Sequence, residues 1–100
     1  MKKKNKHHKW RHAKIYWVSE SDGGRKTIPT GDYYYPTTQI AEFGAWSLVI
    51  LIDESTANQA RVSDCKVRFL FEHAPHHLLG SHSKLDIYEG PRKVARMVTL

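Results

Sequence analysis

The stretch that decides the fold is Lys84–Leu100, which reads KLDIYEGPRKVARMVTL. Two apolar, β-prone runs in this stretch flank a turn at Glu89–Arg92. Gly90 can adopt a positive φ, and the ring of Pro91 holds its φ near the value that turns require, so the chain is expected to reverse here. The stretch therefore predicts a β-hairpin at the end of the chain.

The second strand of this hairpin has an interrupted pattern. Val94, Val98 and Leu100 share one phase of an alternating strand, and Arg96 falls in the same phase. We expect either a β-bulge near Arg96 or an arginine whose head group reaches out of the end of the fold.

The chain before the hairpin contains four more segments with the character of strands. The second of them is interrupted by Pro36, which places it at a sheet edge or a strand end. The segments are Ala13–Ser19, Tyr33–Tyr35 with extended structure resuming after Pro36 at Gln39–Ile40, Trp46–Ile52 and Arg61–Glu72. The clearest alternation lies in the last segment and predicts four residues that face the core: Cys65, Val67, Phe69 and Phe71. Six short strands separated by Gly and Pro turns predict an all-β fold, a small six-stranded antiparallel barrel that is closed or nearly closed.

The remaining segments are expected to be loops. Glu20–Thr27 is polar and contains paired glycines. Residues 73–83 form a loop that is predicted to insert Leu78 and Leu79 into the core. No helical periodicity of useful length appears anywhere in the chain.

The basic residues are concentrated at the N-terminus. The chain has 16 Lys and Arg against 10 Asp and Glu, a net charge of +6. Seven of the basic residues lie in the first 14 positions: Lys2, Lys3, Lys4, Lys6, Lys9, Arg11 and Lys14. We therefore expect a basic, flexible arm over residues 1–12 and a near-neutral barrel domain over residues 13–100.

Several classes of protein are disfavoured by composition. No apolar run approaches the roughly 20 residues of a membrane span. The lysines at the N-terminus precede no apolar segment of a secretory signal, and the single cysteine, Cys65, cannot form an internal disulfide. These features favour a cytoplasmic protein without a membrane partner.

Two motifs resemble a known family. Ile87–Ala95 (IYEGPRKVA) is similar to the REGGRTVGAG hairpin that ends the C-terminal β-barrel of elongation factor Tu. Glu20–Thr27 (ESDGGRKT) resembles the EEGGRHTPF loop that follows the first strand of that barrel. The resemblance covers Ala13 to Leu100 and extends to small stand-alone bacterial proteins of the same barrel type. It implies a role in translation, with contacts to transfer RNA or to partner proteins through Gly23, Gly24 and Arg25.

The sequence supports a non-catalytic module that binds structured RNA, either transfer or ribosomal RNA. Lysines and arginines neutralise phosphates, Trp10 can stack on a base, and glycine N–H groups beside cations suit an anion. The predicted contact residues are Lys2, Lys3, Lys4, Lys6, Lys9, Trp10, Arg11, Gly23, Gly24, Arg25 and Lys26. A structural alternative for the glycine loop is a strand connection in which Arg25 pairs with Asp22 or Glu20.

The alternative function is that of a protein-interaction module with an incidental arm. Three consecutive tyrosines, Tyr33, Tyr34 and Tyr35, cannot all point inward from a strand, so at least one ring is expected to be exposed. Together with Leu70 they would form an exposed face, and exposed tyrosine is common at interfaces.

Cofactors and catalysis find little support in the sequence. No phosphate-binding loop of the Gly-x-x-x-x-Gly-Lys-Ser/Thr type is present, so we expect no GTP binding. One loop contains four histidines: His73, His76, His77 and His82. No Cys-x-x-Cys or His-Glu-x-x-His element accompanies them, so we expect no bound metal. No nucleophile elbow or pair of catalytic carboxylates appears, so we expect no enzymatic activity.

Overall fold

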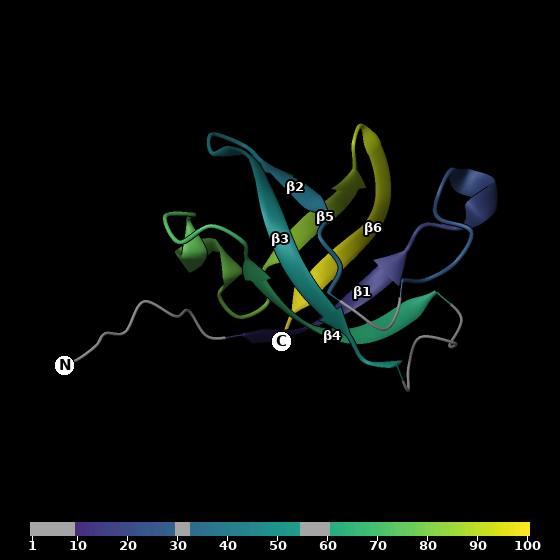
Figure 1. Ribbon diagram of the computed structural model, residues 1–100, viewed down its shortest axis with the longest axis horizontal. Helices are drawn as coiled ribbons and strands as arrows, with labels where there is room; N and C mark the ends of the chain where they lie inside the picture. Colours follow the sequence, from purple (N-terminus) through teal and green to yellow (C-terminus); the bar gives the residue numbers. More distant parts are fainter. Residues whose placement is uncertain (1–9, 30–32, 55–60) are drawn as a thin grey trace.

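The computed structural model describes residues 10–29, 33–54 and 61–100. Six strands make up most of this part of the chain (Figure 1). They are β1 (Arg11–Trp17), β2 (Thr37–Ile40), β3 (Gly44–Ile52), β4 (Val62–Phe69), β5 (Lys84–Glu89) and β6 (Arg92–Thr99). Two short 3-10 helices, η1 (Glu20–Asp22) and η3 (His76–Leu79), lie in the connections. The predicted flexibility of residues 1–9 concerns positions outside the described residues.

The six strands close into a barrel in the order β1-β4-β3-β2-β5-β6, and β6 pairs with β1. Every pairing is antiparallel. Each strand therefore has a neighbour on both sides, and no strand of the described chain presents an unpaired edge. The structure confirms the predicted six-stranded antiparallel barrel. Its weakest seam joins β2 to β5, where Thr37 pairs with Tyr88 and the Thr38 hydroxyl donates to the Asp86 carbonyl at 2.7 Å.

The first strand begins earlier than the sequence indicates. Arg11 already pairs with Val67 of β4, so β1 includes two residues that the hydrophobic pattern assigned to the arm. The side chain of Arg11 donates from Nε to the Leu79 carbonyl at 2.8 Å. Backbone pairing with β4 extends the strand beyond the apolar residues that identify it.

The terminal hairpin forms as predicted, with a two-residue turn at Gly90–Pro91 and a φ of 61° at Gly90. The irregularity of β6 lies at Val94 and not at Arg96. Ile87 pairs with Ala95 while Tyr88 pairs with Lys93, which leaves Val94 as the extra residue of a bulge.

The bulge corrects the predicted orientation of the last strand. Beyond it, Ala95, Met97 and Thr99 point inward and are fully buried. Leu100 is 54% exposed, and the side chain of Arg96 lies outside the barrel near Asp86. Val94 itself is buried, so the bulge places two consecutive residues in the core.

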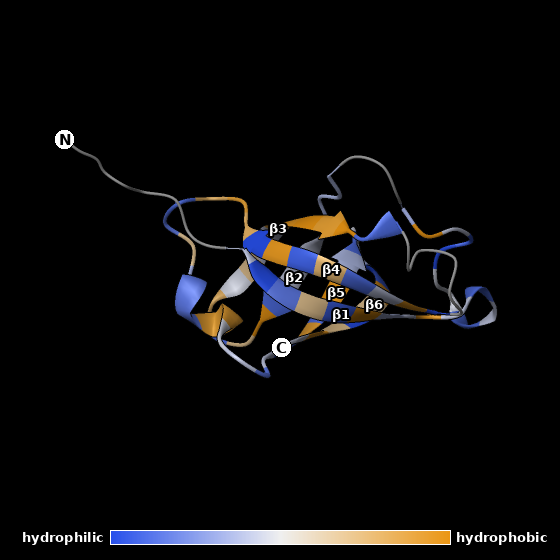
Figure 2. Ribbon diagram, turned by 90° about the horizontal axis from the view of Figure 1, so that it is seen from below, coloured by the Kyte–Doolittle hydropathy of each residue, from blue (hydrophilic) through white to orange (hydrophobic). Residues whose placement is uncertain are grey.

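The core is filled by the inward phase of each strand, and alternating polar and apolar colours run along the strands in Figure 2. Cys65, Val67 and Phe69 are buried as predicted. Of the two leucines predicted to enter the core, Leu79 belongs to the core cluster and Leu78 is only partly buried and lies outside it. Phe71 was predicted to continue the inward phase of β4, but it is 48% exposed because the strand ends at Phe69. No helix in the described ranges is long and apolar enough to cross a membrane.

Candidate nucleic-acid interface

The outer surface of β3 carries apolar side chains, although the opposite side of the strand already faces the core. Leu48, Ile50 and Ile52 belong to the core cluster, so Val49 and Leu51 between them point outward. Tyr34 forms an isolated bridge with Ile50. Its neighbours Tyr33 and Tyr35 therefore project to the same outer side as Val49 and Leu51.

Flat side chains from three separate segments meet over this part of β3. The rings of Trp10 and Tyr33 are nearly parallel, with an interplanar angle of 9° and a centroid distance of 6.1 Å. The guanidinium carbon of Arg68, a residue of β4, lies 4.9 Å from the centroid of the Trp10 ring. Tyr35 is tilted by 57° against Tyr33 at 6.4 Å.

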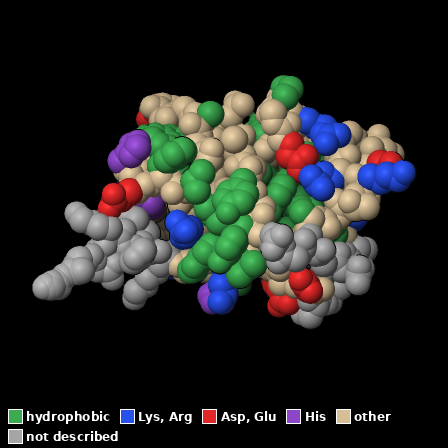
Figure 3. Space-filling model, in the orientation of Figure 1, with side chains coloured by type: hydrophobic (Ala, Val, Ile, Leu, Met, Phe, Trp, Pro, Cys, Tyr) green, Lys and Arg blue, Asp and Glu red, His purple; other side chains and the backbone are tan. Residues whose placement is uncertain are grey.

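The strand surface at this place is buried at Val49 and open to solvent at Leu51, which is 37% exposed. Val49 is only 2% exposed although it points away from the core. In the space-filling view of Figure 3, hydrophobic side chains gather at the centre of this side of the molecule. We call this surface the aromatic face, and its residues are Trp10, Tyr33, Tyr35, Val49, Leu51 and Arg68.

Basic groups adjoin the aromatic face. Lys66 is exposed on β4, where it pairs with Leu51 of β3 on one side and with His12 of β1 on the other. A groove of about 390 Å³ runs along this row. Its lining includes His12, Leu51 and Lys66, followed by acidic residues farther along the strands. The acidic residues are Asp53, Glu54 and Asp64, of which Asp64 is paired with Lys14 at 2.6 Å, and Lys66 is the basic residue of the lining.

The lysine-rich segment joins the barrel at the aromatic face. Trp10 is the first described residue and is directly bonded to that segment. Of the residues predicted to contact RNA, Lys2, Lys3, Lys4, Lys6 and Lys9 lie outside the described residues. Trp10 belongs to the aromatic face, whereas Arg11 points to the barrel end and binds the Leu79 carbonyl.

The Gly23–Gly24 loop uses its backbone donors internally. The Gly23 N–H donates to the Glu20 carbonyl at 3.0 Å, and the Gly24 N–H donates to the Ser19 carbonyl at 2.8 Å. Gly23 has a φ of 98°. Gly24 is buried, and a Cβ there would lie 1.9 Å from the Val18 carbonyl oxygen. These glycines are therefore accounted for by a tight turn, and neither N–H points to an open anion site.

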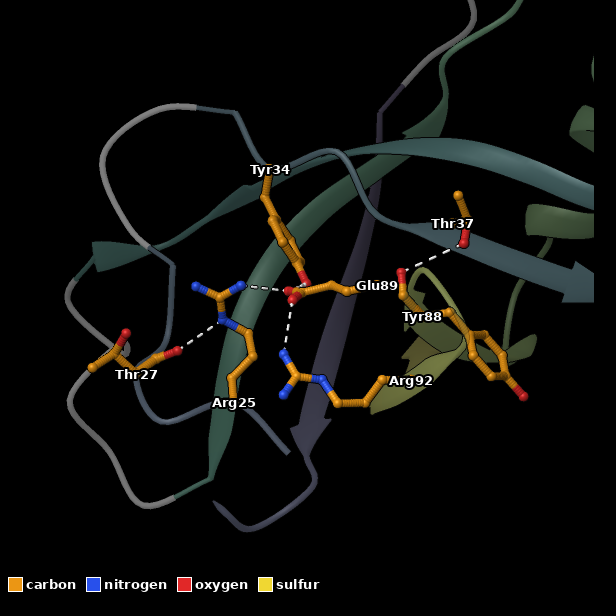
Figure 4. Close-up of polar contacts among 7 residues, drawn as sticks. All are labelled: Arg25, Thr27, Tyr34, Thr37, Tyr88, Glu89 and Arg92. Carbon is orange, nitrogen blue, oxygen red and sulfur yellow. Dashed lines mark hydrogen bonds and ion pairs between the residues drawn. The ribbon is translucent and has the colours of Figure 1, made fainter. Parts of the chain in front are cut away.

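Arg25 pairs with the terminal hairpin and not with Asp22 or Glu20. Its Nη1 lies 2.5 Å from Oε2 of Glu89, and its Nε donates to the Thr27 carbonyl at 2.9 Å (Figure 4). Glu89 also accepts a hydrogen bond from the Tyr34 hydroxyl and a longer contact of 3.4 Å from Arg92. The Glu20–Thr27 loop and the terminal hairpin thus meet in space through the Arg25–Glu89 pair.

The electrostatics of this contact favour an ionised Glu89. Partial burial raises the pKa of Glu89, but the hydrogen bonds from Tyr34 and Arg25 outweigh burial and leave the pKa below its usual 4.5. Burial and the hydrogen bond to Glu89 both raise the pKa of Tyr34, so its hydroxyl remains a donor. Lys26, beside Arg25, is exposed.

The structure separates the three tyrosines. Tyr33 and Tyr35 are 51% and 58% exposed, which confirms that the triplet leaves aromatic rings at the surface. Tyr34 packs against the core, and its hydroxyl donates to Glu89. Leu70 is exposed as expected, at 39%.

The loop histidines lie against aromatic rings. His73 contacts Trp46 at 5.8 Å between centroids, and His76 contacts Phe69 at 5.7 Å. Among residues 10–29, 33–54 and 61–100, no three His, Cys, Asp or Glu side chains are grouped so as to hold a metal ion. Burial, with a smaller effect of Asp64, raises the pKa of the Cys65 thiol to about 12, which disfavours a reactive thiolate.

Sequence reasoning did not identify Arg68 and Lys66 as candidate contacts. The sequence contained one indication of this surface, since Val49 and Leu51 remain apolar in the outward phase of β3. The pairing of these two residues with Arg68 and Lys66 comes from the register of β3 on β4. No protein-family model and no curated protein matches this chain.

Proposed function

We propose that this protein is a non-catalytic module that binds RNA. The lysine-rich N-terminal segment supplies most of the attraction to phosphates, and the aromatic face supplies the contact surface on the barrel. The observation that carries the proposal is the junction at Trp10, where the segment with the highest charge density meets a stack of exposed rings bordered by Arg68 and Lys66. Cationic grooves combined with exposed aromatic rings are typical of proteins that bind single-stranded nucleic acid.

A role in translation is the finer form of this proposal. It rests on the resemblance of the hairpin and the Gly23–Gly24 loop to elongation factor Tu, which suggests transfer or ribosomal RNA as the ligand. Since both glycine N–H groups donate within the protein, we assign the phosphate contacts to the N-terminal lysines, Lys66 and Arg68, with Lys26 as an outlying cation.

The proposal is tested by fluorescence anisotropy of labelled transfer RNA over a salt series. Because β1 begins at Arg11, charge is removed by substitution in the full chain and not by truncation. The logarithm of the binding constant falls as the logarithm of the salt concentration rises, and each lost phosphate contact should reduce the magnitude of this slope by about 0.7–0.9. Replacing Lys2, Lys3, Lys4 and Lys6 with serine should therefore lower the magnitude of the slope by up to about 3.6.

A matched pair of variants tests the contribution of the barrel. Lys66→Ser should lower the salt slope by about 1, whereas Lys84→Ser should leave it unchanged. Both lysines are exposed, but Lys84 lies on β5, two strands away from β3 in the barrel. Absence of binding, or a slope that the four N-terminal substitutions do not change, would refute the proposal. Capture of a protein partner that depends on Tyr33 and Tyr35, without RNA binding, would establish the interaction-module function instead.

A further inference from the structure

We infer that the aromatic face binds unpaired RNA bases by stacking, with Tyr33 and Tyr35 as the rings that receive them. The inference rests on the proposed RNA binding and specifies the part of the RNA that the barrel recognises. It assigns to the two tyrosines a role distinct from the electrostatic one of the lysines.

Trp10 connects the side chain of Arg68 to that of Tyr33. The guanidinium of Arg68 contacts the Trp10 ring, and Trp10 lies parallel to Tyr33, so these three flat side chains form one connected cluster. Such clustering holds the rings in place before a ligand arrives, which lowers the entropy cost of binding. The stack therefore presents a prepared surface.

The rings of Tyr33 and Tyr35 are exposed to solvent. Tyr33 is 51% exposed and Tyr35 is 58% exposed, while Val49 beneath them is almost fully covered. The sheet surface is covered at Val49, whereas Leu51 of the same face is 37% exposed, so the most exposed apolar side chains of the aromatic face are Tyr35, Tyr33 and Leu51. Because Tyr35 is tilted by 57° against Tyr33, the two rings offer surfaces in different directions. This arrangement suits separate bases of a splayed strand.

Two cations of this surface lie on β4. Arg68 belongs to the stack, and Lys66 lies two residues away on the same side of β4, beside Leu51. A strand with bases on the tyrosines would carry phosphates along β3 and β4, on the side where Arg68 and Lys66 lie. Apart from the Lys14–Asp64 pair, the acidic lining of the groove lies at the end away from the stack.

A paired helix is excluded as the ligand of this surface. In a duplex, the flat faces of the bases are stacked on one another and are not available to protein rings. Sequence-specific RNA recognition accordingly uses unpaired loops and ends, whose bases stack on aromatic side chains.

The experiment compares three probes of equal phosphate number with the full chain. They are a single-stranded RNA of about ten nucleotides, an abasic ribose-phosphate strand of the same length, and a blunt RNA duplex. Stacking predicts that the single strand binds roughly tenfold more tightly than the abasic strand, and that the duplex resembles the abasic strand.

Variants connect this difference to the tyrosines. Tyr33→Leu and Tyr35→Leu, made together, should weaken binding of the single strand by roughly tenfold and leave the abasic strand unaffected. Tyr16→Leu is the matched control, because Tyr16 is 45% exposed on β1 opposite Arg96 and outside the aromatic face. Thermal unfolding checks that each variant is folded.

The outcomes separate the two proposals. Equal affinity for all three probes, still dependent on salt and on the N-terminal lysines, would overturn the stacking inference and leave RNA binding in place. The stacking inference is likewise overturned if Tyr16→Leu weakens binding as much as the double variant. Failure to bind any probe would overturn both.

Discussion

Glu89→Gln is the substitution whose effect is best defined by the structure. The side chain of Glu89 is 23% exposed and accepts from Arg25 at 2.5 Å, from the Tyr34 hydroxyl, and from Arg92 at 3.4 Å. Glutamine keeps the shape and can still accept from Tyr34. It loses the charge, and its amide group would place N–H donors against those of Arg25.

The magnitude follows from the three contacts. A hydrogen bond to a charged group contributes about 1.5–3 kcal/mol, and that value applies to the partly buried Arg25 contact. Arg92 is 54% exposed and its pair with Glu89 is long, so it adds at most a few tenths of a kcal/mol. We expect the free energy of unfolding to fall by about 2 kcal/mol near neutral pH, which corresponds to a decrease of about 10 °C in Tm.

The pH dependence gives the sharper test. The pKa of Glu89 is lower in the folded protein than its usual 4.5, so its contribution to stability is complete above that value and is lost as pH falls through the folded pKa. The difference between wild type and Glu89→Gln should therefore shrink in acid. Urea unfolding over a pH series from about 7 to about 2 measures it.

A matched carboxylate controls for general charge effects. Glu72→Gln removes the same charge from an exposed position beyond β4 and should change stability by no more than about 0.5 kcal/mol. The reasoning is refuted if Glu89→Gln costs the same free energy in acid as at neutral pH, since packing and not charge would then be the cause. A loss at neutral pH no larger than that of Glu72→Gln would also refute it.

Two further predictions concern the glycine loop and the buried thiol. Gly24→Ala should destabilise the protein by several kcal/mol, because its Cβ would lie 1.9 Å from the Val18 carbonyl oxygen, whereas Gly23→Ala meets no atom and should cost only about 1 kcal/mol for its φ of 98°. Comparable losses in thermal unfolding of the two variants would contradict this geometry. The Cys65 thiol, 4% exposed and with a pKa raised to about 12 by burial, should react slowly with a disulfide reagent at about pH 8 until urea unfolds the chain. Complete reaction of the native protein within the mixing time would show that the thiol is accessible.

The predictable part of the fold is the part encoded in local patterns. Alternation with a period of two identified the inward residues of β1 and β4, and the Gly90–Pro91 turn identified the hairpin. These features depend on residues close together in the chain. Errors arose where the pattern was extended past a strand end, as at Phe71, or across the bulge at Val94.

The candidate site was predictable only in its ingredients. The N-terminal charge, Trp10 and the tyrosine triplet were all visible in the sequence, but they pointed to two different functions. Pairing of Tyr34 with Ile50 turns Tyr33 and Tyr35 outward, and the register of β1 on β4 brings Trp10 beside Arg68. One surface therefore combines features that the sequence assigned to separate sites.

By itself, the sequence determined the class of fold, the closing hairpin and the uneven charge, because each depends on composition or on neighbours along the chain. Only the tertiary structure decided that Arg25 binds Glu89, 64 positions away, and that Trp10 stacks on Tyr33. The physical reason is that closure of the barrel sets the register of all six strands together. The partners of a side chain on the outer wall depend on that register, which the local alternation of polar and apolar residues does not specify.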